Sequence, residues 1–338
     1  MTRSLGPPRP LILGTNRPAA RFYAGGTQID VFRSLPAGAD HTPEDWVAST
    51  TPVRGQAPVG LSTLPDGTLL LDAVTEDPEG WLGADHVARW GSDTMILVKL
   101  LDAGQRLPVH AHPNEAFAAA ELTAAHGKAE AWFILEPGVV YLGLREDIDR
   151  AELARLVREQ DTTALLGLLN EVTVATNDAV VVPPGTLHAI GRSVLLAEVQ
   201  QPSDLSILLE WDGFAIDGEA EGHLGLGFDR ALEAVDARGM SPAEVEGLVR
   251  RSVVEGPVFP PLAAGWFRLD RVTSSAEFGA GFAVVIAVEG RTRLITAAGM
   301  VELAKGETAV VPAAAGPVTV ETDRATLIAR PPAAARED

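Results

Sequence analysis

The stretch that decides the fold is Leu107-Pro108-Val109-His110-Ala111-His112-Pro113, and a second stretch, Pro183-Pro184-Gly185-Thr186-Leu187-His188, follows it later in the chain. Alternate side chains of a strand point to the same face, so His110 and His112 place two imidazoles side by side. The Pro-Pro-Gly-Thr sequence predicts a tight turn that delivers His188 at the start of the next strand. Together the three histidines predict a metal site.

A carboxylate that could complete this site lies between the two stretches, in Gly127-Lys128-Ala129-Glu130-Ala131-Trp132-Phe133. Glu130 is an acid among apolar strand residues, and we predict a three-histidine, one-carboxylate site. This ligand set suits zinc, manganese, iron or nickel. Glu115 is the alternative carboxylate. Pro113-Asn114 breaks the strand before it and an alanine-rich helical pattern follows, so we expect Glu115 to point away from the imidazoles.

Composition limits the class of protein. The chain has 338 residues, 46% of them hydrophobic, which predicts a large core in two or three modules. It has no cysteine, so disulfides and thiolate ligands are excluded. It shows no signal peptide and no run of about 18 apolar residues, and we expect a cytoplasmic protein. The net charge of -19 argues against nucleic acid and anionic membranes as partners, while a small anionic substrate could still bind at local cations.

The pattern of apolar runs predicts a mainly β protein. Short alternating or β-branched runs at 107–112, 131–135, 139–144, 179–182 and 194–200 are separated by Gly, Pro and Asp, as in an antiparallel barrel or sandwich. The segment before Thr94 also predicts β-structure. Helical spacing predicts insertions at 114–125 and 148–169 and a linking helical stretch at 229–251, in which Ser241-Pro242 is a helix start signal.

The C-terminal part carries a weak internal repeat. Its sequence Lys305-Gly-Glu-Thr-Ala-Val-Val-Pro312 is similar to Asn177-Asp-Ala-Val-Val-Val-Pro183. No histidine follows His223, so if both halves are barrels, only the first can hold the metal.

In combination, the two histidine stretches, the Gly127–Trp132 segment and Glu198-Val-Gln-Gln-Pro-Ser-Asp204 resemble the type I mannose-6-phosphate isomerases of the cupin superfamily, in their short bacterial form. The resemblance implies two cupin (jelly-roll) barrels with an inserted helical segment at 148–171 and a metal site in the first barrel only. It also implies one Zn²⁺ per chain and an aldose-ketose isomerase that converts mannose 6-phosphate to fructose 6-phosphate. The expected division is 1–110 for the N-terminal β part of the first barrel, 111–228 for the catalytic core, and 229–338 for a linker helix and a degenerate second barrel.

Two positions depart from the family pattern. A glutamine usually stands where this chain has His110, and an arginine where it has Leu208. Leucine cannot replace the charge of an arginine, so another cation must substitute or the substrate must differ. The alternatives are therefore an isomerase of an unphosphorylated or different sugar, and a metal cupin that binds sugar without turnover. An iron or manganese cupin that carries out oxygen chemistry is a further alternative. Oxygenase cupins usually place their glutamate a few residues after the histidine pair, whereas Glu130 follows a predicted helical insertion, and this spacing counts against that alternative.

Four residues are candidates for catalysis. Lys128 shares a strand face with Glu130 and could bind a substrate oxyanion or phosphate, although it could also be an exposed strand-end lysine. Arg192 would share a face with His188 and could replace the family arginine, or could lie on the surface. Asp204 and Glu210 stand where the family keeps catalytic groups, and either could act as a base if burial raises its pKa. The expected partner is a sugar or sugar phosphate.

Overall fold

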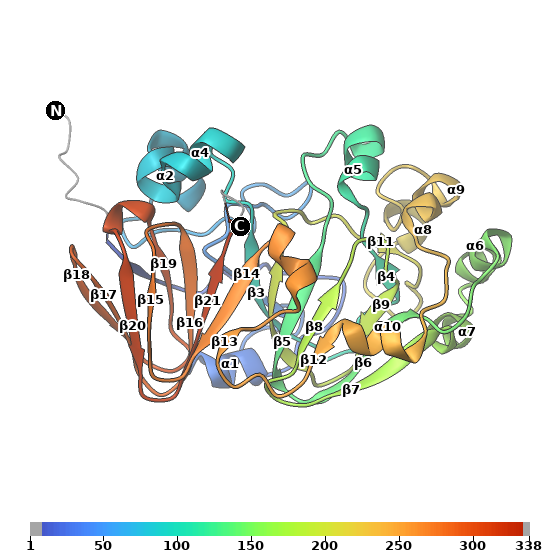
Figure 1. The fold of residues 1–338 in the computed structure, drawn as a ribbon. Coiled ribbons are helices and arrows are strands. Elements are labelled where there is room, and N and C mark those ends of the chain that lie inside the picture. The colour runs from blue at the N-terminus through green and yellow to red at the C-terminus, as the bar shows by residue number, and fades with distance from the viewer. Residues whose placement is uncertain (1–8, 334–338) are drawn as a thin grey trace.

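The computed structural model describes residues 9–333, and four β-sheets stacked in layers dominate it (Figure 1). Sheet 1 contains, in spatial order, β12 (Val249–Arg250), β8 (Ala179–Val182), β5 (Glu130–Glu136), β10 (Leu195–Gln200), β3 (Leu97–Asp102) and β2 (Glu44–Val47). Sheet 2 contains β11 (Ile207–Leu208), β4 (His110–Ala111), β9 (His188–Ile190), β6 (Gly138–Leu144) and β7 (Leu169–Val174). These two sheets face each other in the N-terminal two-thirds of the chain.

The C-terminal part forms the other two sheets. Sheet 3 contains β1 (Leu11–Leu13), β19 (Thr308–Val311), β16 (Ala283–Glu289), β21 (Ala325–Arg330), β14 (Arg268–Val272) and β13 (Gly256–Pro257). Sheet 4 contains β15 (Ser275–Phe278), β20 (Val318–Thr322), β17 (Thr292–Thr296) and β18 (Gly299–Leu303). The β8 and β19 strands carry the two copies of the internal repeat, one in sheet 1 and one in sheet 3.

Alternation along the strands explains the layering. In β5, Trp132 and Ile134 pack toward Val140 and Leu142 of sheet 2 and form one core. Phe133, on the opposite face, packs in a second core that includes residues of sheet 3 such as Leu269 and Ile286. Both faces of sheet 1 are therefore buried, and a third core lies between sheets 3 and 4. The mainly β class with inserted helices is confirmed.

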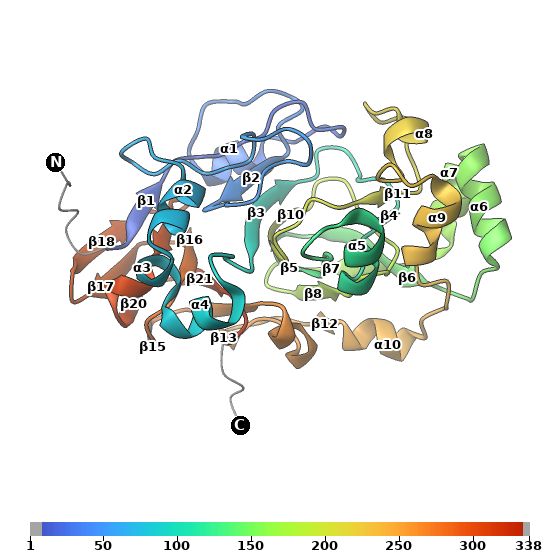
Figure 2. The same cartoon turned by 90° about the horizontal axis from the view of Figure 1, so that it is seen from above.

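The helices lie around the sheets, as Figure 2 shows from above. Four come early in the chain, and the others cover sheet 2 or link the halves: α1 (Gln28–Phe32), α2 (Leu70–Glu76), α3 (Pro78–Leu82), α4 (Ala84–Trp90), α5 (Glu115–Leu122), α6 (Arg150–Glu159), α7 (Thr162–Gly167), α8 (Gly218–Glu221), α9 (Phe228–Ala231) and α10 (Pro242–Gly247). Short 3₁₀ turns are η1 (Leu232–Ala234), η2 (Pro261–Gly265) and η3 (Ala313–Ala315). Within the described residues, no helix has both the length and the apolar character needed to cross a membrane.

The insertion at 148–169 was predicted as one helical segment, and it forms two helices. Asp149 caps α6 by accepting from Ala151 N, and Asp161 caps α7 by accepting from Ala164 N. The two helices meet at Gln160, which adopts the left-handed region with φ of 49°. They pack on the outer face of sheet 2 with leucines that include Leu153 and Leu165.

Two predictions of local structure were wrong. The described residues before Thr94 form α1 to α4 and two short strands. Of these helices, α3 begins with a side-chain cap, since Asp77 accepts from Gly80 N and Pro78 follows Asp77 at the first helical position. The stretch 229–251 is not one helix. It is interrupted between η1 and α10, where Gly239 packs directly against the backbone of Glu146, although Ser241 starts α10 with a capping box as predicted.

The first strand joins the far half of the molecule. Leu11, Ile12 and Leu13 of β1 pair with Val310, Ala309 and Thr308 of β19 in sheet 3. The division at residue 110 assigns this strand to the first barrel, whereas the structure places it at the edge of the C-terminal sheet (Figure 2).

Candidate metal centre and its pocket

Three histidines meet on the inner face of sheet 2. His110 in β4 is the direct register partner of His188 in β9, and His112 follows two residues after His110. One ring nitrogen from each lies within 4.8 Å of the other two, and all three side chains are buried. Gly185, with φ of +85°, lets the predicted turn form and donates its N–H to the carbonyl of His112 at 2.7 Å. The structure brings the three histidines together as the spacing predicts.

Backbone carbonyls fix the orientation of each ring. The Nδ1 atoms lie 2.8 Å from Pro108 O in His110, 2.8 Å from Leu205 O in His112, and 2.9 Å from Thr186 O in His188. A carbonyl can only accept, so each Nδ1 carries the proton and each Nε2 presents a lone pair. Burial, with the neighbouring histidines, lowers the pKa of His110 well below its ordinary value. Burial and the charge of Lys128 lower the pKa of His112 to about 3.

Glu130 faces two of these lone pairs. Its carboxylate oxygens lie 3.0 Å from His112 Nε2 and 3.1 Å from His188 Nε2. Burial alone would raise the pKa of Glu130, but Lys128 and the histidines outweigh it and hold this pKa well below the usual range. Among the described residues, His112 Nε2, His188 Nε2 and Glu130 Oε2 are buried atoms without a hydrogen-bond partner. Lone pairs and a carboxylate directed at one another repel unless a cation lies between them, so the four residues fit a metal ion.

Glu115 points away from the histidines, as predicted. Asn114 caps α5, and the Glu115 carboxylate accepts a hydrogen bond from Gln201 Nε2 at 2.8 Å. Gln201 Oε1 in turn accepts from the backbone N–H of Ala129, next to Glu130. Glu115 therefore contacts a residue that braces the Glu130 strand.

A pocket opens beside the histidines across the inner face of sheet 1. The register of the strands places Glu198 of β10 opposite Lys99 of β3, and Lys99 opposite Trp46 of β2. Glu130 of β5 and Glu44 of β2 lie on the same face of this sheet. A row of polar side chains thus runs from the histidine end to β2, and the pocket also includes Arg21, Tyr23, His110, Lys128 and Asp204.

Burial and neighbouring charges shift the pKa of several groups in the pocket. Burial would lower the pKa of Arg21 and Lys99, but nearby carboxylates outweigh it and raise both values. Burial would raise the pKa of Glu44, but Arg21 and Lys99 lower it to about 2. For Glu198 burial dominates and raises the pKa, although Lys99 opposes this. The 3.5 Å separation of Lys99 Nζ and Glu198 Oε2 is a loose ion pair, which agrees with the rise for Glu198.

The four predicted catalytic residues divide into two groups. Lys128, with Nζ 3.1 Å from Glu130 Oε2, and Asp204 lie in the pocket. Glu210 does not, because its buried carboxylate accepts from Arg106 and from Val109 N–H at 2.9 Å. Arg192 is exposed and donates to Gly104 O. The strand β9 ends at Ile190, so Arg192 lies beyond the strand and does not line the pocket beside His188.

Sequence reasoning missed Arg21 and Glu198 as pocket residues, and it considered Lys99 only as one of several local cations that could make a positive pocket. Lys99 and Glu198 are charged residues inside otherwise apolar strands, the same signal that identified Glu130. Arg21 lies in a loop and carries no such signal. Leu208 pairs with His110 and so lies on the same face of sheet 2, but it is buried and does not line the pocket.

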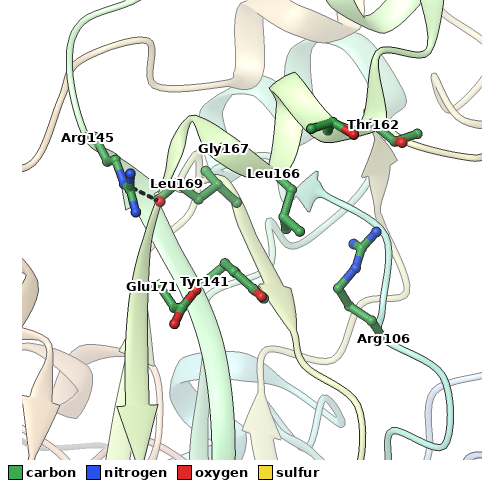
Figure 3. A pocket seen from close by; sticks show the side chains of 9 residues that line it. Arg106, Tyr141, Arg145, Thr162, Leu166, Gly167, Leu169 and Glu171 are labelled. Carbon is green, nitrogen blue, oxygen red and sulfur yellow. Dashed lines mark hydrogen bonds between the residues drawn. The ribbon is translucent and has the colours of Figure 1, made fainter.

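A second pocket lies on the outer face of sheet 2 beside α7 (Figure 3). Tyr141 and Glu171 of the sheet face Leu166 there, and Arg145 Nε donates to Leu169 O at 2.9 Å. Arg106 lines one side, and its guanidinium is also paired with Glu210. None of the predicted site residues lines this pocket.

The curated proteins and solved structures that are similar to this chain, and that are described here, are mannose-6-phosphate isomerases. No protein-family model matches the chain. The mannose-6-phosphate isomerase ManA of Bacillus subtilis is 27% identical over 237 residues, which is 67% of this chain and 71% of the relative. Three further curated relatives match 53% of this chain and about half of their own length, 54–55%.

The solved structures agree on the fold. The crystal structure of the Bacillus subtilis mannose 6-phosphate isomerase has a TM-score of 0.70 at 22% identity and covers 95% of this chain and 99% of its own. The apo form of the Salmonella typhimurium enzyme has a TM-score of 0.74 at 17% identity, with 97% and 100% covered. At this identity the likeness concerns the fold alone. The resemblance that the motifs predict is confirmed: the curated homologues and the structural neighbours of this chain are mannose-6-phosphate isomerases.

Proposed function

We propose that this chain is a zinc-dependent aldose-ketose isomerase that converts mannose 6-phosphate to fructose 6-phosphate. One observation carries the proposal: three buried imidazole lone pairs and the Glu130 carboxylate converge beside a pocket lined with charged and hydrogen-bonding groups. The relatives named above are mannose-6-phosphate isomerases, which supports the same reaction.

The proposed metal ligands are His110, His112, Glu130 and His188. All are nitrogen or oxygen ligands, and the chain has no thiolate to offer. Three neutral histidines and one carboxylate suit zinc. When bound, a divalent cation polarises the oxygens at C1 and C2 of the sugar and stabilises the negative charge that develops on them.

The chain's own residues must hold the sugar and move a proton between C1 and C2. Lys128 Nζ is held by Glu130 and faces the pocket, so it can donate a hydrogen bond to a sugar oxygen next to the histidines. We propose Lys128, Glu198 and Asp204 as the candidates for the proton carrier, because all three face the pocket. Asp204 is less free than the other two, since its carboxylate accepts from Arg54 N and pairs with Arg21.

A second candidate function is the isomerisation of an unphosphorylated or different sugar. The observation that favours it is Leu208, which gives an apolar side chain where the resemblance expects an arginine. A third reading, sugar binding without turnover, makes no use of the proton-carrying groups in the pocket.

The test compares mannose 6-phosphate with free mannose as substrates of the zinc-loaded protein, in one assay that follows the ketose product. We expect kcat/KM to be higher for the phosphate. Higher activity on free mannose would favour the second function, and no turnover of either sugar would contradict the first function and leave isomerisation of a different sugar or sugar binding without turnover. Elemental analysis after dialysis separates zinc from redox metals.

A further inference from the structure

Arg21 is a largely buried arginine whose two contacts with carboxylates are long. Its side chain is 12% exposed and lines the pocket. Its Nε lies 3.5 Å from Glu44 Oε2, its Nη2 lies 3.5 Å from Asp204 Oδ1, and the buried Nε has no hydrogen-bond partner. The other arginine–carboxylate pairs of the described residues are all 3.2 Å or shorter, as in Arg33–Asp45 at 2.9 Å.

The two carboxylates beside Arg21 also accept hydrogen bonds from other donors. Glu44 accepts from Tyr23 OH and from Trp46 Nε1 at 2.6 Å. Asp204 accepts from the backbone N–H of Arg54 at 3.1 Å. A guanidinium has five N–H donors, and a buried donor without an acceptor is costly. The structure therefore leaves Arg21 with donors that an oxygen-rich anion in the pocket would satisfy.

Backbone contacts with His41 and two aromatic rings fix the position of Arg21. Its backbone N–H donates to His41 O at 3.1 Å, and His41 Nδ1 lies 2.8 Å from its carbonyl oxygen. The rings of Phe22 and Trp46 lie 5.8 and 5.9 Å from its guanidinium carbon. A side chain held in this way can bind a ligand without first being ordered, which favours affinity.

Arg21 lies across the pocket from the histidines. Glu130 is on β5 and Glu44 is on β2, and the sheet order places β10 and β3 between them. Three strand intervals of about 4.8 Å separate the two ends of the row. A sugar whose reacting carbons lie at the histidine end would direct its other end along Glu198 and Lys99 toward Arg21.

We propose that Arg21 binds the phosphate group of the substrate and so supplies the cation that Leu208 cannot. The inference rests on the proposed function and deepens it, because it assigns the group that distinguishes a phosphorylated sugar from a free one. A guanidinium can hold two phosphate oxygens with parallel hydrogen bonds, which a lysine cannot do.

The test uses Arg21→Lys in the zinc-loaded full chain. Lysine keeps a positive charge near Glu44 and Asp204 but loses the paired donors. We expect KM for mannose 6-phosphate to rise about 10- to 100-fold, since charge-assisted hydrogen bonds are lost. The kcat for the phosphate and kcat/KM for free mannose should stay within about threefold of wild type. The control is Arg145→Met on the outer face of sheet 2, which should leave KM and kcat unchanged for both substrates.

Other outcomes overturn the inference. Equal losses of kcat/KM for mannose 6-phosphate and for free mannose would show that Arg21 only positions Glu44 and Asp204. An unchanged KM for mannose 6-phosphate would show that Arg21 does not bind the phosphate. Arg21→Met is a stricter test, because it removes the positive charge as well as the paired donors. Thermal unfolding shows whether this variant still folds. Calorimetric titration with mannose 6-phosphate and with mannose separates this failure from that of the proposed function. If wild type turns over neither sugar, weaker binding of the phosphate alone by Arg21→Lys still supports Arg21, and equal binding contradicts it.

Discussion

Single hydrogen bonds determine what the histidine cluster can bind. Because each Nδ1 is occupied by a carbonyl, each Nε2 must meet a proton or a cation, and burial disfavours the proton. The spacing of His110 and His112 and the turn at Gly185 are local features, so the sequence alone could predict the cluster. Arg21 could not be predicted, because its role depends on Glu44 and Asp204, which only the fold brings next to it.

Removing one ligand should release the metal. We expect His188→Ala to lose bound metal after dialysis and at least about 100-fold in kcat/KM, because two neutral nitrogens and one carboxylate form an incomplete site. Glu115→Gln is the matched control, since Glu115 contacts Gln201 and not the histidines. Elemental analysis of both variants is the measurement. Stoichiometric metal in His188→Ala would contradict the ligand assignment.

Glu210 should matter for stability and not for catalysis. Arg106→Met would leave a buried carboxylate with Val109 N–H as its remaining donor, and we expect a loss of about 2–4 kcal/mol in the free energy of unfolding. Glu210→Gln should keep kcat within about threefold of wild type, since the carboxylate does not face the pocket. Urea unfolding and the isomerase assay test the two statements. A kcat for Glu210→Gln that falls far beyond threefold would return Glu210 to the catalytic group.

At the scale of elements, the longer apolar strands were predictable and the short helices were not. β5 and β10 carry seven and six residues with clear apolar character, whereas α1 to α4 are five to seven residues long. Such helices hold few periodic positions, and of these four only α3 has a side-chain cap, so the local signal is weak. The end of β9 at Ile190 was also missed, so Arg192 was expected on the face of His188.

The loop between α5 and β5 should contribute stability that depends on pH. His126 Nε2 lies 2.7 Å from Asp93 Oδ2 in the loop between α4 and β3. Burial alone would lower the pKa of His126, but Asp93 outweighs it and raises this pKa, while burial of Asp93 is outweighed by His126, which lowers the pKa of Asp93. The pair therefore stabilises fully between about pH 4 and 6.5. This contribution fades as pH rises through the folded pKa of His126, or falls through that of Asp93.

The variant that tests this pair is His126→Gln. We expect it to lower the free energy of unfolding by about 0.5–1 kcal/mol at pH 6 and by less at pH 8.5, since the pair is partly exposed. Urea unfolding at both pH values is the measurement. Glu121→Gln on α5 is the control, because neither Glu121 nor its partner Arg230 titrates between these values. An equal loss at pH 6 and pH 8.5 would show that the charge of His126 contributes nothing.

At the scale of the whole molecule, sheet 1 joins the two halves. One of its faces lines the pocket and the other packs toward sheet 3, and β1 forms the far edge of sheet 3 (Figure 2). The sequence predicted β-structure in both halves from local patterns. It could not predict the pairing of β1 with β19, because a strand of three residues carries no signal for a partner nearly the whole chain away.

A core residue between sheets 1 and 3 should therefore control both halves together. Phe133 is fully buried in that core, and we expect Phe133→Ala to lower the free energy of unfolding by about 3–5 kcal/mol. In a urea titration, metal release should report the loss of the histidine cluster, and amide exchange in β16 and β21 should report the loss of sheet 3. Each signal gives a midpoint of unfolding. Because Phe133 packs against both halves, the two midpoints should fall together, while the exposed Met300→Ala should leave them unchanged. Two separate transitions, with only metal release shifted, would mean that the C-terminal sheets fold without support from sheet 1.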